Sequence, residues 1–438
     1  MPPGSFLFAY GSLAGAPGAR PARLRDHRRT WGIAMDNTVT IPGYKAYLAA
    51  DGSRPDVCVA FLDVEPAPGA SVQGELLPVD RAGLRALDRR ERNYDRVDVS
   101  GLVDGAPAGA RVWTFEGLPA ARDRLARTRA AGRAVVHAAY ARSVAGFEAD
   151  TVPHDLPVVA LERIELPPPT LDRDGYVLVP DVAGPELLAP LVELAWSAWG
   201  VDPDDPSTWR TAPAEDAPAV WGHQAQWDLR QHPGVHAAFA RLLGRDELWV
   251  SQDGLGVRAP GDPGMPVHWD VDPRADFPHR VLGGLVYVTD TPLARGPFRA
   301  VPGLFRDLDG WFDRHPGTGS DPDDLWDIDV EDHASMAVPG CAGDLVVWDA
   351  RLPHGNEAVA GSAPRLVQFL TMWPPGTWGE TAADHQAIWR SRRPNPAYLH
   401  KPGWDRTEPW GPAALTPLGR RLIGLEPWAG DPRTRVPG

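Results

Sequence analysis

The segment Val267-His268-Trp269-Asp270, read with the later segment from Gly343-Asp344-Leu345 through Trp348-Asp349 to Pro353-His354-Gly355-Asn356, decides the fold of the longer half of the chain. In a strand, His268 and Asp270 project from one face, because side-chain direction repeats every two residues. His354 is far enough along the chain for several strands to return to the same place. Two imidazoles and one carboxylate form the facial triad that holds non-haem Fe(II) and leaves positions open for a co-substrate and dioxygen. The sequence therefore predicts a metal site for oxygenation.

Arg365 adds a second group to this prediction. It lies in the segment from Pro364 to Leu370, whose β-branched and aromatic residues are typical of a strand. A guanidinium holds a carboxylate through two parallel hydrogen bonds, as bound 2-oxoglutarate would require at its far end. A His-x-Asp pair on its own is also common as an ordinary hydrogen-bonded or surface pair. The ordered set of His-x-Asp, a Gly-Asp turn, an apolar strand, His-Gly and Arg favours the metal site.

From about residue 168 onward the chain resembles the phytanoyl-CoA dioxygenase family of Fe(II)/2-oxoglutarate oxygenases. The resemblance rests on the two segments quoted above and on Gly296-Pro297-Phe298-Arg299-Ala300-Val301-Pro302-Gly303. It implies a double-stranded β-helix, a form of jelly roll, with flanking helices. It also implies that His268, Asp270 and His354 are iron ligands and that Arg365 binds 2-oxoglutarate. Related halogenases lack the carboxylate ligand, so Asp270 implies hydroxylation or desaturation.

The N-terminal part of the chain contains a second pair of motifs. Ser5 to Ala9 is a short apolar strand that runs into the turn Tyr10-Gly11-Ser12-Leu13, whose backbone amides can face an anion or a developing oxyanion. Later, Leu84 to Glu91 reads as a short helix and Tyr94 to Val99 as a strand, so that Glu91 lies at their junction. A surface carboxylate paired with a neighbouring arginine is the alternative interpretation of Glu91.

Residues 5 to about 147 resemble the γ-glutamylcyclotransferase-like superfamily, through Tyr10 to Leu13 and Leu87 to Arg96. The resemblance implies a small mixed β-barrel with helices, a substrate site at Tyr10, Gly11, Ser12 and Leu13, and Glu91 as general acid/base. In that reaction the α-amine of a γ-glutamyl group attacks its own γ-carbonyl and releases an amine and 5-oxoproline, and orientation and a proton shuttle supply most of the rate. Many members of the superfamily have other substrates.

Length and composition limit the remaining possibilities. A chain of 438 residues exceeds what one core serves efficiently. The stiff Pro167-Pro168-Pro169 break predicts two domains, 1–165 and 166–438. A net charge of −14 argues against nucleic acid as a partner. No stretch is apolar enough for a membrane span, and the two cysteines, Cys58 and Cys341, fit a reducing compartment. We expect a cytoplasmic location.

Some elements are predicted directly. Gly184-Pro185 opens a helix that runs through Trp199 to a stop at Gly200, residues 120–145 read as a helical stretch broken at Gly132, and residues 201–233 read as a long loop. Together, the motifs and the composition predict an α+β, bifunctional enzyme that acts on a small molecule and requires Fe(II), 2-oxoglutarate and O₂. The alternative is that one or both halves are binding modules without turnover.

Overall fold

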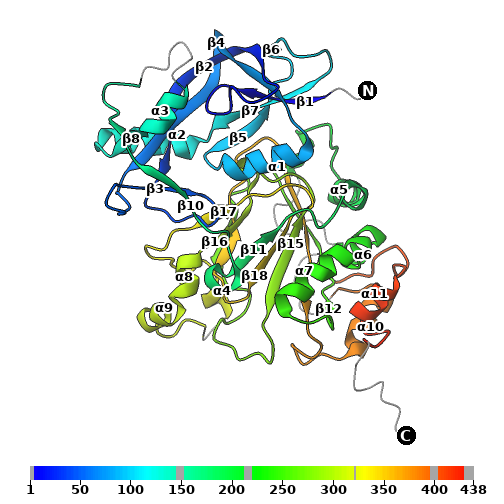
Figure 1. Cartoon of the computed structure of the whole chain (residues 1–438). Coiled ribbons are helices and arrows are strands. Elements are labelled where there is room, and N and C mark those ends of the chain that lie inside the picture. The colour runs from blue at the N-terminus through cyan, green and yellow to red at the C-terminus, as the bar shows by residue number, and fades with distance from the viewer. Residues whose placement is uncertain (1–3, 145–151, 212–219, 320–321, 395–402, 429–438) are drawn as a thin grey trace. The chain divides into compact units, whose positions relative to one another are not determined.

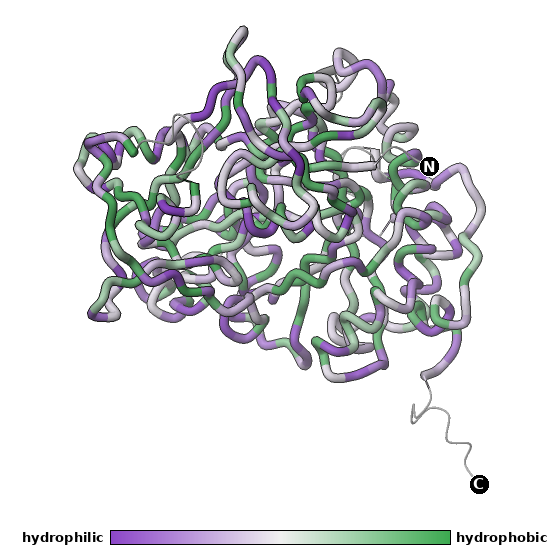
Figure 2. The backbone as a smooth tube through the Cα atoms, turned by 45° about the horizontal axis from the view of Figure 1, so that its top comes forward, coloured by the Kyte–Doolittle hydropathy of each residue, from purple (hydrophilic) through white to green (hydrophobic). Residues whose placement is uncertain are grey.

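The computed structural model describes residues 4–144, 152–211, 220–319, 322–394 and 403–428. It divides into two compact units, residues 1–168 and residues 169–438, which are treated separately below. The predicted boundary, residue 165, is the last residue of a strand of the first unit. Among the described residues, no helix has both the length and the apolar character that crossing a membrane would require. In keeping with this, hydrophobic and hydrophilic segments are interspersed along the chain in Figure 2.

The described residues of the first unit form ten strands and three helices (Figure 1). The strands are β1 (Ser5–Ala9), β2 (Arg20–Asp36), β3 (Lys45–Leu48), β4 (Cys58–Pro78), β5 (Tyr94–Asp98), β6 (Val103–Asp104), β7 (Arg111–Gly117), β8 (Ala134–His137), β9 (Val158–Val159) and β10 (Glu162–Glu165). The helices are α1 (Arg81–Arg90), α2 (Pro119–Ala130) and α3 (Ala138–Val144).

A mixed sheet forms the body of this unit, in the order β5-β7-β1-β4-β2-β6, with β8 and β9 joined to it through β4. β1 is antiparallel to β4 and parallel to β7. The long strands β2 and β4, blue in Figure 1, pair along most of their length, with register shifts between Arg25 and His27 and between Trp31 and Ile33. Such irregularities bend a strand and increase its twist, so the sheet curls. β3 and β10 form a separate two-stranded sheet.

The prediction of a helical stretch over residues 120–145 is wrong in its middle. α2 ends at Ala130, Gly132 adopts a φ of 67°, and Ala134–His137 forms β8, parallel to β4. Val135 and Val136 are buried there. The β-branched side chains favour a strand, and the edge of β4 offers backbone partners that the local sequence does not reveal.

The second unit has the remaining elements (Figure 1). Its strands are β11 (Tyr176–Val179), β12 (Trp249–Val250), β13 (Leu255–Arg258), β14 (Met265–His268), β15 (Leu282–Tyr287), β16 (Phe298–Ala300), β17 (Met336–Val338), β18 (Leu345–Asp349), β19 (His354–Asn356), β20 (Arg365–Phe369) and β21 (Met372–Trp373). Its helices are α4 (Leu171–Asp174), α5 (Pro185–Trp199), α6 (Gln224–Arg230), α7 (Pro233–Leu243), α8 (Pro302–Arg306), α9 (Leu308–Arg314), α10 (Ala382–Ser391) and α11 (Pro417–Leu422), with single 3₁₀ turns at Thr208–Thr211, Leu293–Arg295 and Pro322–Leu325.

Two antiparallel sheets carry the second unit. One has the order β11-β18-β15-β20-β13, the other β14-β19-β16-β17, and β12 pairs with β21. Alternation along β20 separates two cores: Leu366 packs into a cluster with the helices, and Val367 into one with Phe298 and Trp348. The mixed α/β composition is confirmed. Closure of the N-terminal sheet into a barrel and the double-stranded β-helix of the second unit stay predictions.

Helix α5 begins and ends where the sequence predicts, with Pro185 in its first turn and Gly200 left-handed at a φ of 73°. The long loop predicted over residues 201–233 is wrong in its described part after residue 220. His223 caps α6 there, by accepting a hydrogen bond from the amide of Ala225. Short polar helices of this kind have weak periodicity, and tertiary packing decides them.

Candidate functional site

The two predicted histidine ligands lie on adjacent antiparallel strands. His268 is the last residue of β14 and His354 is the first residue of β19, and the two are direct partners in the register. Directly opposite residues bring their side chains to the same face of a sheet. Both imidazoles are buried, and their ring centroids are 4.6 Å apart.

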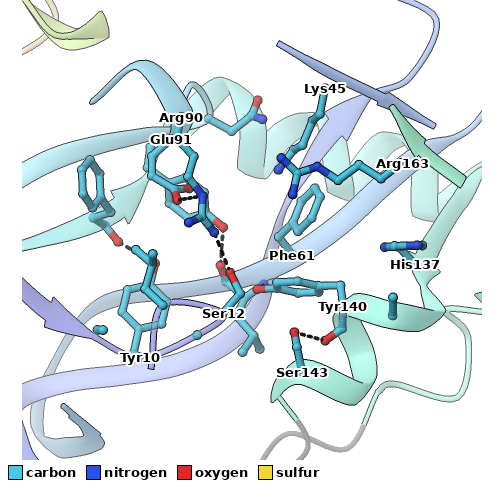
Figure 3. A pocket seen from close by; sticks show the side chains of 18 of the residues that line it. Tyr10, Ser12, Lys45, Phe61, Arg90, Glu91, His137, Tyr140, Ser143 and Arg163 are labelled. Atoms are coloured by element: carbon cyan, nitrogen blue, oxygen red, sulfur yellow. Dashed lines mark hydrogen bonds and ion pairs between the residues drawn. The ribbon is translucent and has the colours of Figure 1, made fainter. Parts of the chain in front are cut away.

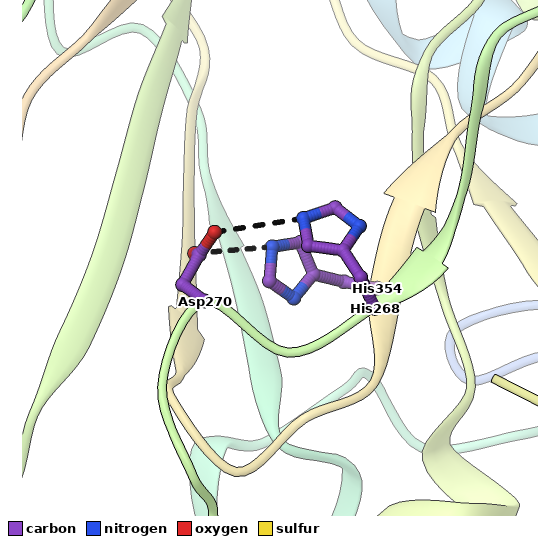
Figure 4. A group of neighbouring side chains, drawn as sticks. All are labelled: His268, Asp270 and His354. Carbon is purple, nitrogen blue, oxygen red and sulfur yellow. Dashed lines mark ion pairs between the residues drawn. The ribbon is translucent and has the colours of Figure 1, made fainter. Parts of the chain in front are cut away.

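Asp270 completes the group, but not from the strand that the sequence predicts. β14 ends at His268, and Asp270 lies in the bend that follows. The His-x-Asp alternation of a strand is therefore wrong as a description of the local backbone. The carboxylate still reaches both imidazoles: Oδ1 is 3.5 Å from Nε2 of His268, and Oδ2 is 3.3 Å from Nε2 of His354 (Figure 4). These three side chains could together hold a metal ion.

The other nitrogen of each imidazole fixes which atom faces the carboxylate. Nδ1 of His268 lies 2.9 Å from the carbonyl oxygen of Pro266, and Nδ1 of His354 lies 3.0 Å from that of Leu352. A carbonyl only accepts, so each Nδ1 carries a proton, and each Nε2, when it carries none, can offer a lone pair to a metal ion. Two lone pairs and a carboxylate then converge on one point. That donor set fits a divalent cation, and backbone hydrogen bonds that orient ligating histidines are usual at metal sites.

Aromatic side chains hold both imidazoles in place. The indole of Trp326 is parallel to the ring of His268, with centroids 4.1 Å apart. His354 packs against the rings of Phe298, at 5.5 Å, and Trp348, at 5.0 Å, which also contact each other. Phe298 and Trp348 are buried, while Trp326 is 48% exposed. One side of the group is therefore part of the core, and the other carries an indole that solvent can reach.

The charge of Asp270 is favoured in this arrangement. Desolvation raises the pKa of the Asp270 carboxyl, but the two neighbouring imidazoles, His354 above all, lower it by more, so the pKa lies well below its usual range. More than half of the side chain, 54%, remains accessible. The group therefore offers a carboxylate anion rather than a neutral acid.

Arg365 is a buried cation with donors that have no partner. It begins β20, is 1% exposed, and faces the same side as Val367, which packs with Phe298 and Trp348 next to His354. Its Nε and Nη2 make no hydrogen bond to any described residue. Burial lowers the pKa of Arg365 to about 10, and the nearby Tyr287 and Arg258 affect it less. An unpaired buried guanidinium is costly, so this site fits an anionic ligand.

A second cluster of possible ligands does not resemble a vacant metal site. Asp307, Glu331 and His333 lie close together. The guanidinium of Arg314 is 2.7 Å from both carboxylates. An arginine already supplies the positive charge there, so we interpret this cluster as an ion-pair network.

In the first unit, the predicted residues line a cavity of about 450 Å³ (Figure 3). Tyr10, Gly11, Ser12 and Leu13 contribute the turn after β1, and Glu91 contributes the C-cap of α1. The Glu91 side chain is 15% exposed and pairs with Arg90 at 3.1 Å. Arg90 also donates a hydrogen bond of 3.0 Å to the hydroxyl of Ser12. Glu91 is thus paired with an arginine, as the alternative interpretation has it, and also lines a cavity, while its role as general acid/base stays a prediction.

Buried phenols surround this carboxylate. The hydroxyl of Tyr10 donates to the carbonyl of Phe115 at 2.6 Å, and that of Tyr94 donates to the carbonyl of Leu62 at 2.6 Å. Burial raises the pKa of both phenols well above the usual value, and the charge of Glu91 adds to this effect. Both remain protonated donors at neutral pH. The hydroxyl proton of Tyr10 is thus used in a hydrogen bond within the protein rather than in one to a ligand.

Several cavity residues escaped the sequence analysis. Lys45, His137, Tyr140 and Arg163 all line the cavity, and they lie on the four elements β3, β8, α3 and β10. No local motif marks any of them. The one usable signal is composition, since Lys45 is one of only two lysines in an arginine-rich chain.

Comparison with known proteins matches both parts to families. Residues 171–367 match the family model for phytanoyl-CoA dioxygenase, and residues 7–132 match that for γ-glutamyl cyclotransferase, AIG2-like. The C-terminal part is thus phytanoyl-CoA dioxygenase-like and the N-terminal part γ-glutamylcyclotransferase-like, as the sequence predicts.

Individual relatives are distant. "Ava biosynthesis cluster protein O" of Aspergillus versicolor is 26% identical over 46% of this chain and 75% of that protein. A putative phytanoyl-CoA dioxygenase of Dictyostelium discoideum is 22% identical over 42% of this chain and 67% of that protein. The solved structure of the epimerase SnoN in complex with Fe³⁺, alpha ketoglutarate and nogalamycin RO is 21% identical, covers 56% of this chain and 93% of that one, and has a TM-score of 0.35.

Proposed function

We propose that the C-terminal part is an Fe(II)- and 2-oxoglutarate-dependent oxygenase that hydroxylates or desaturates a small molecule. One observation carries the proposal: two imidazole lone pairs and the carboxylate of Asp270 converge on one point, because backbone carbonyls hold the other nitrogens of His268 and His354. The match to the phytanoyl-CoA dioxygenase model supports the same chemistry and agrees with the predicted cofactors, Fe(II), 2-oxoglutarate and O₂.

The chain's own residues have distinct tasks in this proposal. His268, Asp270 and His354 would hold the metal ion as its protein ligands. Arg365 binds the far carboxylate of 2-oxoglutarate through the donors that are otherwise without partners. When bound, iron with 2-oxoglutarate and dioxygen supplies the oxidising equivalent, and 2-oxoglutarate leaves as succinate and carbon dioxide. Because related halogenases lack this carboxylate, the presence of Asp270 favours hydroxylation or desaturation.

The test is iron-dependent conversion of 2-oxoglutarate to succinate by the full chain, loaded with Fe(II) without oxygen and then exposed to air. Binding of Mn(II), measured by calorimetry, gives a second readout that needs no turnover. His268→Ala and His354→Ala should lose both, because two ligands do not hold the metal firmly. His333→Ala is the matched control, since His333 lies in the ion-pair network. Unchanged turnover in either ligand variant contradicts the assignment.

We also propose that the N-terminal part catalyses γ-glutamyl cyclotransfer or related amide chemistry. The observation that favours it is the mostly buried Glu91 carboxylate beside the turn from Tyr10 to Leu13, on one cavity. In this reaction the α-amine nitrogen forms a bond to the γ-carbonyl carbon, and the bond from that carbon to the departing amine breaks. Glu91 takes a proton from the attacking amine and returns it to the departing one. The turn can supply backbone donors to the carbonyl oxygen.

Release of 5-oxoproline from γ-glutamyl amides tests this second proposal. Glu91→Gln keeps the shape of the side chain but cannot accept a proton, so release should stop. Glu65→Gln is the control, since Glu65 pairs with Arg28 on the surface. If the wild-type chain releases no 5-oxoproline from any amide, the alternative applies, and the N-terminal part is a binding module without turnover.

The two parts are joined in one chain, which raises the concentration of each site near the other. We propose that they act in succession on one small metabolite. Domains of 1–165 and 166–438 and a cytoplasmic location remain part of this proposal.

A further inference from the structure

The N-terminal cavity contains a cation that no feature of the cyclotransfer proposal uses. Lys45 opens β3 and lines the cavity. Its Nζ lies 4.2 Å from the centre of the Phe61 ring and 5.3 Å from that of Tyr44. Among the residues that the structure describes, no carboxylate forms an ion pair with it. Aromatic faces stabilise an ammonium only modestly, so most of its capacity to bind an anion is unused.

The charges around the cavity are not balanced. Lys45, Arg90 and Arg163 line it, whereas Glu91 is the only carboxylate among the lining residues. Arg90 pairs with Glu91. Figure 3 shows Lys45 and Arg163 above the ring of Phe61, apart from the Arg90 and Glu91 pair. Arg163 pairs with Glu165, which does not line the cavity, so the charge that stays unbalanced in the cavity wall is that of Lys45.

The strand pairing explains why Lys45 stays unpaired. Glu165 on β10 is the direct partner of Lys45 in the register and would be its natural counter-ion. However, Glu165 accepts a hydrogen bond from Arg163, two residues earlier on the same strand. Its side chain is 64% exposed and turned to that surface pair. The arginine thus takes the carboxylate and leaves the ammonium for another anion.

We propose that Lys45 binds a carboxylate of the molecule that occupies the N-terminal cavity, and that this cavity therefore selects amides that carry a carboxylate. The choice of amide rests on the cyclotransfer proposed above; the role of Lys45 as an anion-binding residue does not. The carboxylate has two possible sources in a γ-glutamyl amide: the glutamyl group itself or the departing amine.

The protonation of Lys45 supports the same role. The pKa of Lys45 is lowered to about 8, chiefly by burial. The charges of Arg163 and Arg90 lower it further, while those of Glu91 and, least of all, Glu165 raise it. An anion held by the ammonium would favour the charged form and raise this pKa. Affinity for the anion should accordingly fall as pH rises through about 8.

The direct test follows Lys45 itself. With only two lysines in the chain, selective ¹³C labelling of lysine gives two side-chain signals, and Lys45→Arg assigns them. The probe is γ-L-glutamylglycine, added to the full chain with Glu91→Gln so that no turnover intervenes. We expect the Lys45 signal to move and its titration midpoint to rise, while the Lys401 signal stays. If neither the chemical shift nor the titration midpoint of Lys45 changes at a saturating concentration of the probe, the proposal is overturned.

Substitution then identifies the source of the carboxylate. Lys45→Met keeps the contact with Phe61 but removes the charge, and it should weaken binding of γ-L-glutamylglycine by about tenfold to a hundredfold. If Lys45→Met weakens the binding of γ-L-glutamylmethylamide equally, Lys45 holds the glutamyl carboxylate, since this amide has no other. If the binding of γ-L-glutamylmethylamide is unaffected, Lys45 holds the carboxylate of the departing glycine. Lys45→Arg should retain most affinity, and Arg28→Gln, a surface change of the same charge, should retain all of it. Equal affinity of wild type and Lys45→Met for both amides overturns the proposal.

These outcomes are separable from failure of the cyclotransfer. Absence of 5-oxoproline with wild-type protein would contradict the reaction at Glu91 and leave the binding arm intact. A normal yield of 5-oxoproline with unchanged affinity and KM in Lys45→Met would contradict the role of Lys45 alone.

Discussion

The indole of Trp326 lies parallel to the imidazole of His268, at an interplanar angle of 1° and a centroid distance of 4.1 Å. Nδ1 of His268 is held by the carbonyl of Pro266, and strand pairing places His268 opposite His354. A half-exposed indole therefore fixes the orientation of a proposed metal ligand.

Removing that indole should loosen the metal site more than the fold. Stacked aromatic pairs contribute about 0.5–1.5 kcal/mol, so Trp326→Ala should weaken Mn(II) binding by about two- to tenfold. Trp326→Phe should restore most of it. The free energy of unfolding should change little, because the side chain is 48% exposed. Calorimetry and urea unfolding measure the two effects, and unaltered Mn(II) affinity in Trp326→Ala would show that the stack has no such role.

Arg365→Met should separate stability from ligand binding. The guanidinium is buried with unpaired donors, so its replacement by an apolar side chain should leave the ligand-free protein equally stable or more stable, by up to about 3 kcal/mol. Loss of a buried charge pair should meanwhile raise the KM for 2-oxoglutarate about 30-fold or more. The melting temperature without 2-oxoglutarate measures the stability, and the rate of succinate formation at varied 2-oxoglutarate measures the KM. If Arg365→Met loses Mn(II) binding but keeps normal affinity for 2-oxoglutarate, Arg365 does not have the proposed role of binding 2-oxoglutarate.

Glu91→Gln tests whether the two parts act in succession. When the native substrate is supplied to the variant, the product of the oxygenase should accumulate, with succinate formation unchanged, because only the N-terminal proton shuttle is lost. Mass spectrometry of the products of wild type and variant makes the comparison. Identical product profiles would remove the coupling and leave the N-terminal part as a recognition module.

Glu380 should make stability depend on acid pH. Its carboxylate accepts hydrogen bonds from the indole of Trp373 at 2.6 Å and the amide of Trp378 at 2.8 Å. Desolvation raises the pKa of Glu380, but the imidazole of His385, 3.9 Å away, and the hydrogen bond from Trp373 outweigh it and lower the pKa to about 2. The pKa of Glu380 is therefore lower in the folded protein than in the unfolded chain, where it is near 4.5. Its ionised carboxylate stabilises the fold at pH values above about 4.5, and this contribution is lost as the pH falls toward about 2.

The matching experiment compares wild type with Glu380→Gln in urea at several pH values. We expect the variant to be less stable at pH 7 by about 1–2 kcal/mol, and the difference to narrow below about pH 4.5. Glu426→Gln, which alters a surface pair with Arg420, serves as the control. A difference that stays constant from pH 7 to pH 3 would contradict the lowered pKa.

The sequence by itself determined what local patterns encode. Pro185 and Gly200 delimit α5 by their backbone preferences, and the apolar run before Asp349 forms a buried strand. The ordered motifs indicated both resemblances. His268, Asp270, His354 and Arg365 carry the one in the second unit, and Tyr10 to Leu13 with Leu87 to Arg96 carry the one in the first.

Only the tertiary structure decided how side chains from distant segments meet. Asp270 reaches the histidines from a bend rather than from the strand that alternation predicts, because β14 ends at His268. β8 forms because β4 offers an edge for it. Lys45 faces a cavity unpaired because Arg163, more than a hundred residues later, takes Glu165, its partner across the strands. Burial and competition between charges depend on which segments pack together, and no local pattern contains that information.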